Sequence, residues 1–284
     1  MSERKKVTLP DLFKKVDTGE PITMLSCYDY PTAHFQELAG IDMILVGDSL
    51  GMTMLGYDGT LPVTMEDMIR HTQAVRRGTP NAWLIGDMPY MSYQISVEEA
   101  IRNAGRFMAE ASTDAIKLEG GAEMADRVVG ITAAGIPAMG HLGLTPQSVS
   151  SLGGFRLQGK GALQAKKIID DAKALEQAGA HAILLELVPD RVCQLITERA
   201  EDCIIISLGG GPHAHGQMLI YHDMFGLYPK FKPRMAKVYA DAGKVILGGL
   251  KSFSDEVKAK QFPFEENYFG IKDAEYEELL QILD

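Results

Sequence analysis

Short apolar runs alternate with amphipathic stretches along most of the chain, and this alternation predicts its secondary structure. Eight apolar runs predict strands near residues 22–27, 42–48, 82–87, 114–119, 136–141, 181–186, 203–208 and 218–223. Apolar residues at helical spacing between most of these runs predict helices at 31–39, 64–77, 96–110, 121–134, 160–178 and 189–200. Strands that are apolar throughout are typical of parallel sheets covered by helices on both faces.

Eight strands with intervening helices predict an α/β fold of the (β/α)8 TIM-barrel type rather than an open sheet. The segment 209–218 is too short for an ordinary helix between the last two strands, so a doubly wound sheet remains the alternative. We expect residues 1–284 to form a single barrel domain. Residues 1–19 are predicted to form a short helix across the barrel bottom. About 230–284 are predicted to form a C-terminal helical extension, with helices at 234–242, 252–260 and 272–283.

Composition and charge narrow the class of protein. With 28 Lys and Arg against 38 Asp and Glu, the formal net charge is −10, which disfavours nucleic acid and anionic membranes as partners. No apolar run approaches the roughly 20 residues of a membrane span, and no apolar segment follows the basic start MSERKKVTLP, so no secretory signal is expected. The three cysteines form no CxxC or Cys/His cluster, which favours a reducing compartment. We therefore expect a soluble, cytoplasmic protein with no nucleic-acid or membrane partner.

Ionisable side chains stand at the ends of five successive predicted strands. A charge at the edge of a buried strand is costly unless it is paired, solvated or bound to a metal. In (β/α)8 barrels the carboxyl ends of the strands form the catalytic face. The pattern therefore predicts an enzyme whose site contains Asp48, Asp87, Lys117, Glu119, His141 and Glu186.

Asp48 and Asp87 each follow a glycine at the end of adjacent predicted strands, so their side chains are expected to lie side by side. Two carboxylates without soft ligands favour a hard divalent cation, Mg²⁺ or Mn²⁺, with positions left for water and substrate oxygens. The alternative is that each aspartate caps the helix or turn that follows it.

Lys117 and Glu119 are two positions apart on one predicted strand, so both side chains point to the same side of the sheet. A lysine beside a carboxylate and a metal can hold a substrate carboxylate or an enolate oxygen. The alternative is a structural Lys–Glu pair.

Glu186 ends the sixth predicted strand within the apolar string AILLELVP, surroundings that suit a general base because they disfavour a charged carboxylate. The alternative is a buried glutamate paired with Lys117 or His141. His141 is a candidate to orient substrate or carry a proton, and a hydrogen-bonded structural histidine is an equal interpretation.

Two further segments have weaker signals. The glycine-rich string SLGGGPHAHGQ follows the seventh predicted strand, where many barrels bind phosphate, but Pro212 removes one donor and a plain turn is the better interpretation. Tyr90 and Tyr93 either line a pocket for a flat ligand or pack in the core.

Several strings together resemble the ketopantoate hydroxymethyltransferase (3-methyl-2-oxobutanoate hydroxymethyltransferase) family over about residues 20–240. They are LVGDSLGMTMLGYDGTLPVTMEDM, HTQAVRRG, GDMPYMSY, AIKLEGG, GHLGLTPQSVSSLGGFRLQGKG, ALEQAGA, LLELVP and GQMLIYHDMFG. GDSLGM and GHLGLTPQS, in this order and spacing, are highly specific.

The resemblance implies a barrel of the phosphoenolpyruvate mutase/isocitrate lyase type. It also implies transfer of a hydroxymethyl group from 5,10-methylenetetrahydrofolate to 3-methyl-2-oxobutanoate, giving 2-dehydropantoate on the route to pantothenate and coenzyme A. The partners it implies are a small 2-oxo acid and folate, the cofactor Mg²⁺, and further copies of the chain in a homodecamer.

The resemblance also assigns roles to individual residues. The family's metal ligands fall on Asp48 and Asp87, with Glu119 as a further carboxylate of the metal shell. The proposed base falls on Glu186. The 2-oxo-acid contacts fall on Ser49 and Lys117, the latter also catalytic. Asp87 and His141 are further expected substrate contacts.

The chain departs from the family pattern in four places. The loop after the seventh strand is GGGP rather than GAGN-like, and His215 stands where an acidic residue is usual before Gly216 and Gln217. Ser207-Leu208 replaces a Gly-Ile pair, and Asn267 replaces a common histidine. These changes are expected to affect folate placement and subunit contacts more than the reaction type.

Two other classes remain open at this stage. A mutase or carbon–carbon lyase acting on phosphoenolpyruvate-like acids would use the same barrel and metal, but no KKCGH-like loop with a catalytic cysteine is present. A non-catalytic barrel relative is supported only by the altered loop at 209–217.

Overall fold

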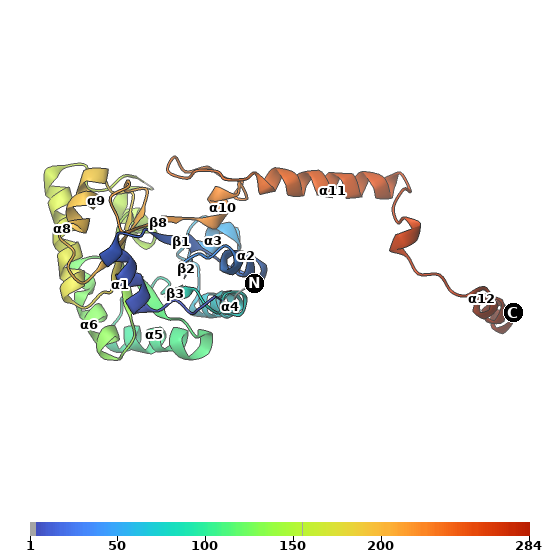
Figure 1. The fold of residues 1–284 in the computed structure, drawn as a ribbon, viewed down its shortest axis with the longest axis horizontal. Helices are drawn as coiled ribbons and strands as arrows, with labels where there is room; N and C mark the ends of the chain where they lie inside the picture. Colours follow the sequence, from blue (N-terminus) through green and yellow to red (C-terminus); the bar gives the residue numbers. More distant parts are fainter. Residues whose placement is uncertain (1–3, 155) are drawn as a thin grey trace.

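Eight parallel strands close into a barrel in the computed structural model of the protein, which describes residues 4–154 and 156–284 (Figure 1). Each strand pairs with its neighbours in the sequence, and β1 pairs with β8 to complete the ring. The predicted closed barrel is confirmed, and the doubly wound alternative is wrong. The strands are β1 Ile22–Ser26, β2 Met43–Val46, β3 Trp83–Asp87, β4 Ala115–Glu119, β5 Ala138–Gly143, β6 Ala182–Glu186, β7 Ile204–Leu208 and β8 Gly216–Leu219.

Six longer helices surround the barrel, and each lies within a few residues of its predicted range. Local sequence explains where they begin. The Thr64 hydroxyl accepts a hydrogen bond from the backbone N–H of Asp67, and the Asp67 carboxylate accepts one from the backbone N–H of Thr64, so a capping box starts α4. The helices are α2 Tyr30–Leu38, α4 Met65–Gly78, α5 Val97–Ala111, α6 Ala125–Ala133, α8 Ala162–Gln177 and α9 Asp190–Thr197. The short α3 Leu50–Thr53, α7 Val149–Leu152 and α10 Tyr221–Met224, and the 3-10 turns η1 Ala122–Met124, η2 Pro146–Ser148 and η3 Glu265–Asn267, were not predicted as separate elements.

Strand residues alternate between two hydrophobic layers. Met43 and Leu45 of β2 point into the barrel interior, whereas Ile44 and Val46 pack against the outer helices. This alternation follows from the two-residue period of a strand. Because both layers are apolar, the strands read as continuous apolar runs in the sequence.

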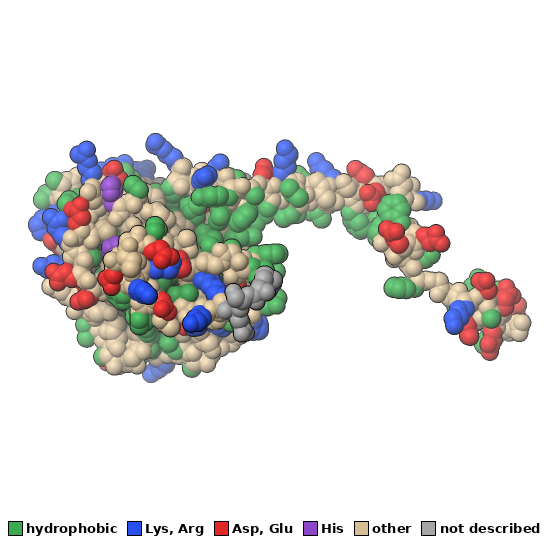
Figure 2. Space-filling view, viewed as in Figure 1, with side chains coloured by type: hydrophobic (Ala, Val, Ile, Leu, Met, Phe, Trp, Pro, Cys, Tyr) green, Lys and Arg blue, Asp and Glu red, His purple; other side chains and the backbone are tan. Residues whose placement is uncertain are grey.

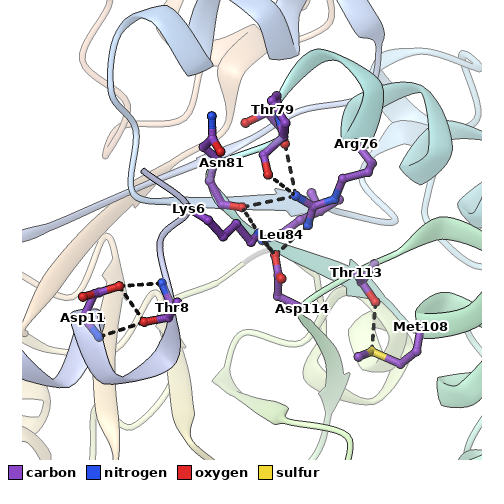
Figure 3. Close-up of polar contacts among 12 residues, drawn as sticks. Lys6, Thr8, Asp11, Arg76, Thr79, Asn81, Leu84, Met108, Thr113 and Asp114 are labelled. Atoms are coloured by element: carbon purple, nitrogen blue, oxygen red, sulfur yellow. Dashed lines mark hydrogen bonds and ion pairs between the residues drawn. The ribbon is translucent and has the colours of Figure 1, made fainter. Parts of the chain in front are cut away.

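The N-terminal segment closes the bottom of the barrel. Helix α1, Leu9–Thr18, buries Leu12 completely within the interior layer. Just before it, Nζ of Lys6 lies 2.5 Å from Oδ2 of Asp114, which also accepts from Arg76 at 2.6 Å (Figure 3). Within the predicted range 1–19 the helix covers only Leu9–Thr18, residues 4–8 are irregular, and residues 1–3 lie outside the described residues.

The region after β7 differs from prediction. The predicted strand at 218–223 is displaced: β8 is Gly216–Leu219, and the residues that follow form α10. A Cβ at Gly216 would lie 2.5 Å from the carbonyl oxygen of Ile22, so the glycine lets β8 approach β1 closely. Nδ1 of His215 accepts from the backbone N–H of Ile205 at 3.0 Å, and this contact gives the unusual histidine a structural role.

The helix predicted at 234–242 is wrong. Residues 234–241 form turns and irregular backbone, and the Asp241 side chain accepts from the N–H of Lys244 to begin α11 at Ala242. Helix α11, Ala242–Lys258, replaces the shorter helix predicted at 252–260. Helix α12, Asp273–Leu283, lies close to the predicted 272–283.

Helix α11 leaves the barrel and projects into solvent (Figure 1). An exposed apolar stripe runs along it, formed at spacings of four and three residues by Ile246, Leu250, Phe253 and Val257. Figure 2 shows hydrophobic side chains gathered on this helix. Among the described residues, no helix is both long and apolar enough to cross a bilayer.

Candidate active site

A cavity of about 580 Å³ opens at the carboxyl end of the barrel strands. All seven site residues predicted from the sequence line it: Asp48, Ser49, Asp87, Lys117, Glu119, His141 and Glu186. Its volume is typical of pockets that bind small organic ligands, roughly 300–1,000 Å³. The strand-end pattern therefore located one continuous site.

Strand register places the charged side chains at matching levels. Asp87 pairs with Lys117 across β3 and β4, and Glu119 pairs with His141 across β4 and β5. Nζ of Lys117 lies 2.7 Å from Oδ1 of Asp87 and 3.7 Å from Oε1 of Glu119. Lys117 is thus an ammonium held between two carboxylates, all of them almost fully buried.

Asp48 joins this cluster through the loop after β2. Its backbone N–H donates to Oδ2 of Asp87 at 2.9 Å, and its own Oδ2 accepts from the Gln147 side chain at 2.9 Å. These contacts tie the two aspartates to each other and to the loop after β5, rather than to the starts of the helices that follow them. The hydrogen bonds therefore do not support the alternative that each aspartate caps the helix or turn after it.

Burial dominates the electrostatics of the cluster. It raises the pKa of Asp48, with the Glu119 charge adding to the effect, and it raises the pKa values of Asp87 and Glu119. Burial alone would lower the pKa of Lys117, but the carboxylates of Asp87, Glu119 and Asp48 together raise it. Lys117 is therefore charged. Additional positive charge near the three carboxylates would favour their ionised forms.

The donor set fits a hard divalent cation. Three carboxylates face one ammonium, and Oδ1 of Asp87 and Oε1 of Glu119 are buried without a hydrogen-bond donor apart from their ion-pair contacts. In the part of the chain that the structure describes, no three His, Cys, Asp or Glu side chains are already grouped as ligands around one point. Lys117 lies between two of the predicted ligands, so the predicted set Asp48, Asp87 and Glu119 stays a prediction.

His141 connects the cluster to Glu186. Its Nε2 lies 3.1 Å from Oε2 of Glu186, and its Nδ1 lies 3.3 Å from both Nζ of Lys117 and Oε1 of Glu119. Burial and then the Lys117 charge lower the pKa of His141, so the ring is neutral. Because Lys117 can only donate, Nδ1 is the acceptor and the proton resides on Nε2, facing Glu186.

Ser49 stands beside Asp48 at the start of α3. Its Oγ lies 2.8 Å from the hydroxyl of Tyr28, which is buried. Burial raises the pKa of Tyr28 to about 12, so it stays a neutral phenol that can donate to Ser49. This contact fixes the serine hydroxyl at the cavity wall.

Gln147 and Tyr93 are buried partners of the cluster that were not predicted as site residues. The Gln147 backbone N–H donates to Oε2 of Glu119, and its Oε1 accepts from the Tyr93 hydroxyl at 2.7 Å. Gln147 belongs to the string GHLGLTPQS, which carried the family resemblance, and that was the only available signal. Of the two tyrosines considered, Tyr93 packs in the core, whereas Tyr90 is exposed.

The glycine-rich loop after β7 uses its hydrogen bonds internally. The N–H of Gly210 donates to Oγ of Ser207, and the Gln217 side chain donates to the carbonyl of Gly211. Gly209, with φ of +79°, lines the cavity at the point where Met235 approaches it. These contacts favour the plain-turn interpretation.

Comparison with known sequences identifies a group of relatives. The family model described as ketopantoate hydroxymethyltransferase matches residues 6–265. A 3-methyl-2-oxobutanoate hydroxymethyltransferase of Alkaliphilus metalliredigens (strain QYMF) is 50% identical over 279 residues, covering 98% of each chain. An enzyme of the same name from Ignicoccus hospitalis is 51% identical over 265 residues, covering 93% of this chain and all of the relative.

Comparison with solved structures supports the fold. A phosphonopyruvate hydrolase solved with oxalate and Mg²⁺ superposes with a TM-score of 0.60 at 12% identity, covering 97% of this chain and 98% of the other. A 2,3-dimethylmalate lyase, of the phosphoenolpyruvate mutase/isocitrate lyase superfamily, gives a TM-score of 0.58 at 10% identity, covering 97% and 99%. At this identity the likeness shows a shared barrel architecture.

Proposed function

The chain belongs to the ketopantoate hydroxymethyltransferase family, and we propose that the cavity at the carboxyl end of its barrel is where that family's reaction takes place. A hydroxymethyl group passes from 5,10-methylenetetrahydrofolate to 3-methyl-2-oxobutanoate, giving 2-dehydropantoate for pantothenate synthesis. The observation that carries this assignment is the buried ammonium of Lys117, held among carboxylates in the same cavity as Glu186.

We propose that Asp48, Asp87 and Glu119 hold Mg²⁺. The three carboxylates outnumber the one buried ammonium, so a divalent cation balances the local charge, and oxygen ligands are those Mg²⁺ prefers. When bound, the cation supplies Lewis-acid stabilisation of negative charge that develops on the keto oxygen of the substrate.

Lys117 and Ser49 position the oxo acid. The Lys117 ammonium attracts the substrate carboxylate, and the Ser49 hydroxyl, held by Tyr28, gives a second polar contact at the wall. Fixing the carboxylate at one end orients the C3–H bond of the substrate toward the base. Asp87 and His141 line the same space and limit its shape.

Glu186 removes the proton from C3 of the oxo acid. The carboxylate lies at the end of β6, almost buried, with Nε2 of neutral His141 at 3.1 Å from Oε2. His141 thereby orients the base, and the resulting carbanion attacks the one-carbon unit of folate. One carbon–nitrogen bond of the folate breaks before the C–C bond forms, and the other breaks as water supplies the product hydroxyl. The proton taken from C3 and the one released by water go to the two folate nitrogens, which leaves tetrahydrofolate.

Proton exchange at C3 tests this assignment without folate. The protein is incubated with 3-methyl-2-oxobutanoate in D2O, with and without Mg²⁺, and loss of the C3 proton signal is followed by NMR. We expect the wild type to exchange this proton when Mg²⁺ is present. Glu186→Gln should lose the exchange, and the exposed control Glu201→Gln should keep it. Normal exchange in Glu186→Gln would remove the base assignment.

The two alternative functions, a mutase or lyase and a non-catalytic relative, are disfavoured. Mutases and lyases share only the barrel fold with this chain, at 10–13% identity. A non-catalytic relative would not be expected to retain a buried set of uncompensated carboxylates, because such a set costs stability. Turnover of a phosphono or 2-hydroxy acid without folate would favour the first alternative over our assignment.

We propose that the chain acts as a homo-oligomer, with ten copies implied by the resemblance to its family. The support is α11, a helix of 17 residues that buries none of its side chains and exposes an apolar stripe. An exposed stripe of this kind is typical of a surface covered on association. Sedimentation velocity of the full chain gives the copy number directly, and a monomer would contradict the proposal.

A further inference from the structure

The cavity is larger and more apolar than a small branched oxo acid requires. Its floor carries the charged residues described above, but its outer wall is formed by the chain from β8 to residue 235. Apolar and aromatic surface there comes from Met218, Ile220, Tyr228, Phe231 and Met235. The cavity therefore offers apolar and aromatic surface beyond what a small oxo acid covers.

Two charged side chains stand at this outer wall. Among the described residues that line the cavity, Asp223 and Arg234 are the charged groups outside the floor. Asp223 is half-buried on α10, directly after β8, and the structure gives its carboxylate no hydrogen bond or ion pair in the described chain. Burial raises its pKa to about 6, since no donor offsets the lost hydration.

An aromatic pair lines the same cavity as these charges. The rings of Tyr228 and Phe231 pack edge to face, with centroids 5.9 Å apart and planes at 81°. Gly209 allows this segment to close over the cavity, because a Cβ there would meet Met235 at 3.1 Å. A carboxylate without a partner, in a cavity with aromatic lining, suits a flat heterocycle with two donors on one edge.

We propose that Asp223 anchors the pterin ring of the folate co-substrate and that Arg234 meets the carboxylates of its glutamate tail. The N3–H and 2-amino groups of a pterin point in the same direction, so they match the two oxygens of one carboxylate. Tyr228 and Phe231 pack against the ring or the aminobenzoyl group that follows it. This inference rests on the proposed function, since it assigns the folate half of the same site.

The experiment separates recognition of the ring from recognition of the tail by using two probes. Binding of tetrahydrofolate and of 6-methyltetrahydropterin, which lacks the aminobenzoylglutamate tail, is measured by titration calorimetry with the full-length protein. Asp223→Asn should weaken both probes roughly 10–100-fold, the range expected for lost hydrogen bonds to a charged group. Arg234→Gln should weaken tetrahydrofolate alone, and Asp223→Glu should recover part of the affinity. The exposed control Asp17→Asn should change neither.

Deuterium exchange at C3 of the oxo acid distinguishes failure of this inference from failure of the proposed function. The exchange is measured on the wild type, and far-UV circular dichroism shows whether Asp223→Asn is folded. Unchanged pterin affinity in Asp223→Asn, or no pterin binding by the wild type, overturns the inference. If the wild type still exchanges the C3 proton in either case, the proposed function is unaffected. A wild type that neither exchanges nor transfers overturns the function itself.

Discussion

Gln147 and Asp48, 99 positions apart, are joined by a hydrogen bond of 2.9 Å between Nε2 and Oδ2. The same amide nitrogen donates to the carbonyl of Met88, and the amide oxygen accepts from Tyr93. One side chain therefore connects the loops after β2, β3 and β5. It holds a proposed metal ligand in place without touching the cavity itself.

Gln147→Leu should weaken both metal binding and the fold. It leaves Oδ2 of Asp48 and the Met88 carbonyl without a donor, and each unsatisfied buried group costs about 1–3 kcal/mol. Loss of the partner of a metal ligand reduces metal affinity roughly 10–100-fold. Urea unfolding and Mg²⁺ titration check the two effects. Gln177→Leu, an exposed change on α8, should alter neither, and wild-type Mg²⁺ affinity in Gln147→Leu would contradict the supporting role.

Asp87→Asn should lower Mg²⁺ affinity by at least about tenfold, because it removes one of the carboxylate charges that attract the cation. It also removes the charge facing Lys117 at 2.7 Å. Isothermal titration with Mg²⁺ measures the change. Asp58→Asn, which removes an exposed carboxylate paired with Lys230, is the matched control. Equal affinity for the two variants would remove Asp87 from the metal set.

Gly86→Ala should destabilise the barrel by roughly 1–3 kcal/mol, the cost typical of overpacking a core. A Cβ at Gly86 would lie 2.3 Å from Cδ1 of the buried ring of Phe107. The contrasting change, Gly105→Ala, meets nothing within 4 Å on helix α5. It should stabilise by about 0.5–1 kcal/mol through helix propensity. Urea unfolding of both variants measures the difference, and equal shifts would contradict the packing argument.

His181 should make the fold sensitive to mild acid. Burial lowers its pKa from 6.5 to about 4, and a contact with the backbone of Ala138 offsets only part of this effect. Between these pH values the unfolded chain binds a proton that the folded chain excludes, so unfolding free energy falls as pH falls. At about 1.4 kcal/mol per pK unit, the loss approaches roughly 3 kcal/mol at pH 4.

Urea unfolding across pH 4–7 tests this linkage. His181→Gln should flatten the dependence relative to the wild type, because other titrating groups remain in both proteins. His213→Gln, at an exposed position, should keep the wild-type slope. If His181→Gln retains the full slope, the acid sensitivity originates elsewhere.

The sequence by itself determined the barrel and which ionisable side chains line the cavity at its mouth. Strands buried on two faces are apolar at every position, and a charge at their ends is conspicuous against that background, as at Asp87 and Glu186. Helices with clear start signals, such as Thr64 before α4, were predicted within a few residues. These features are local, since they depend on periodicity and on neighbours in the chain.

Only the tertiary structure decided how these residues meet. Ring closure through β1 and β8 sets the register, and register places Lys117 level with Asp87. The support from Gln147 and the outer position of Asp223 depend on loops folding over the barrel mouth. No pattern within a strand or helix encodes such distances. They result from the combined geometry of eight strands, which exists only once the chain has closed.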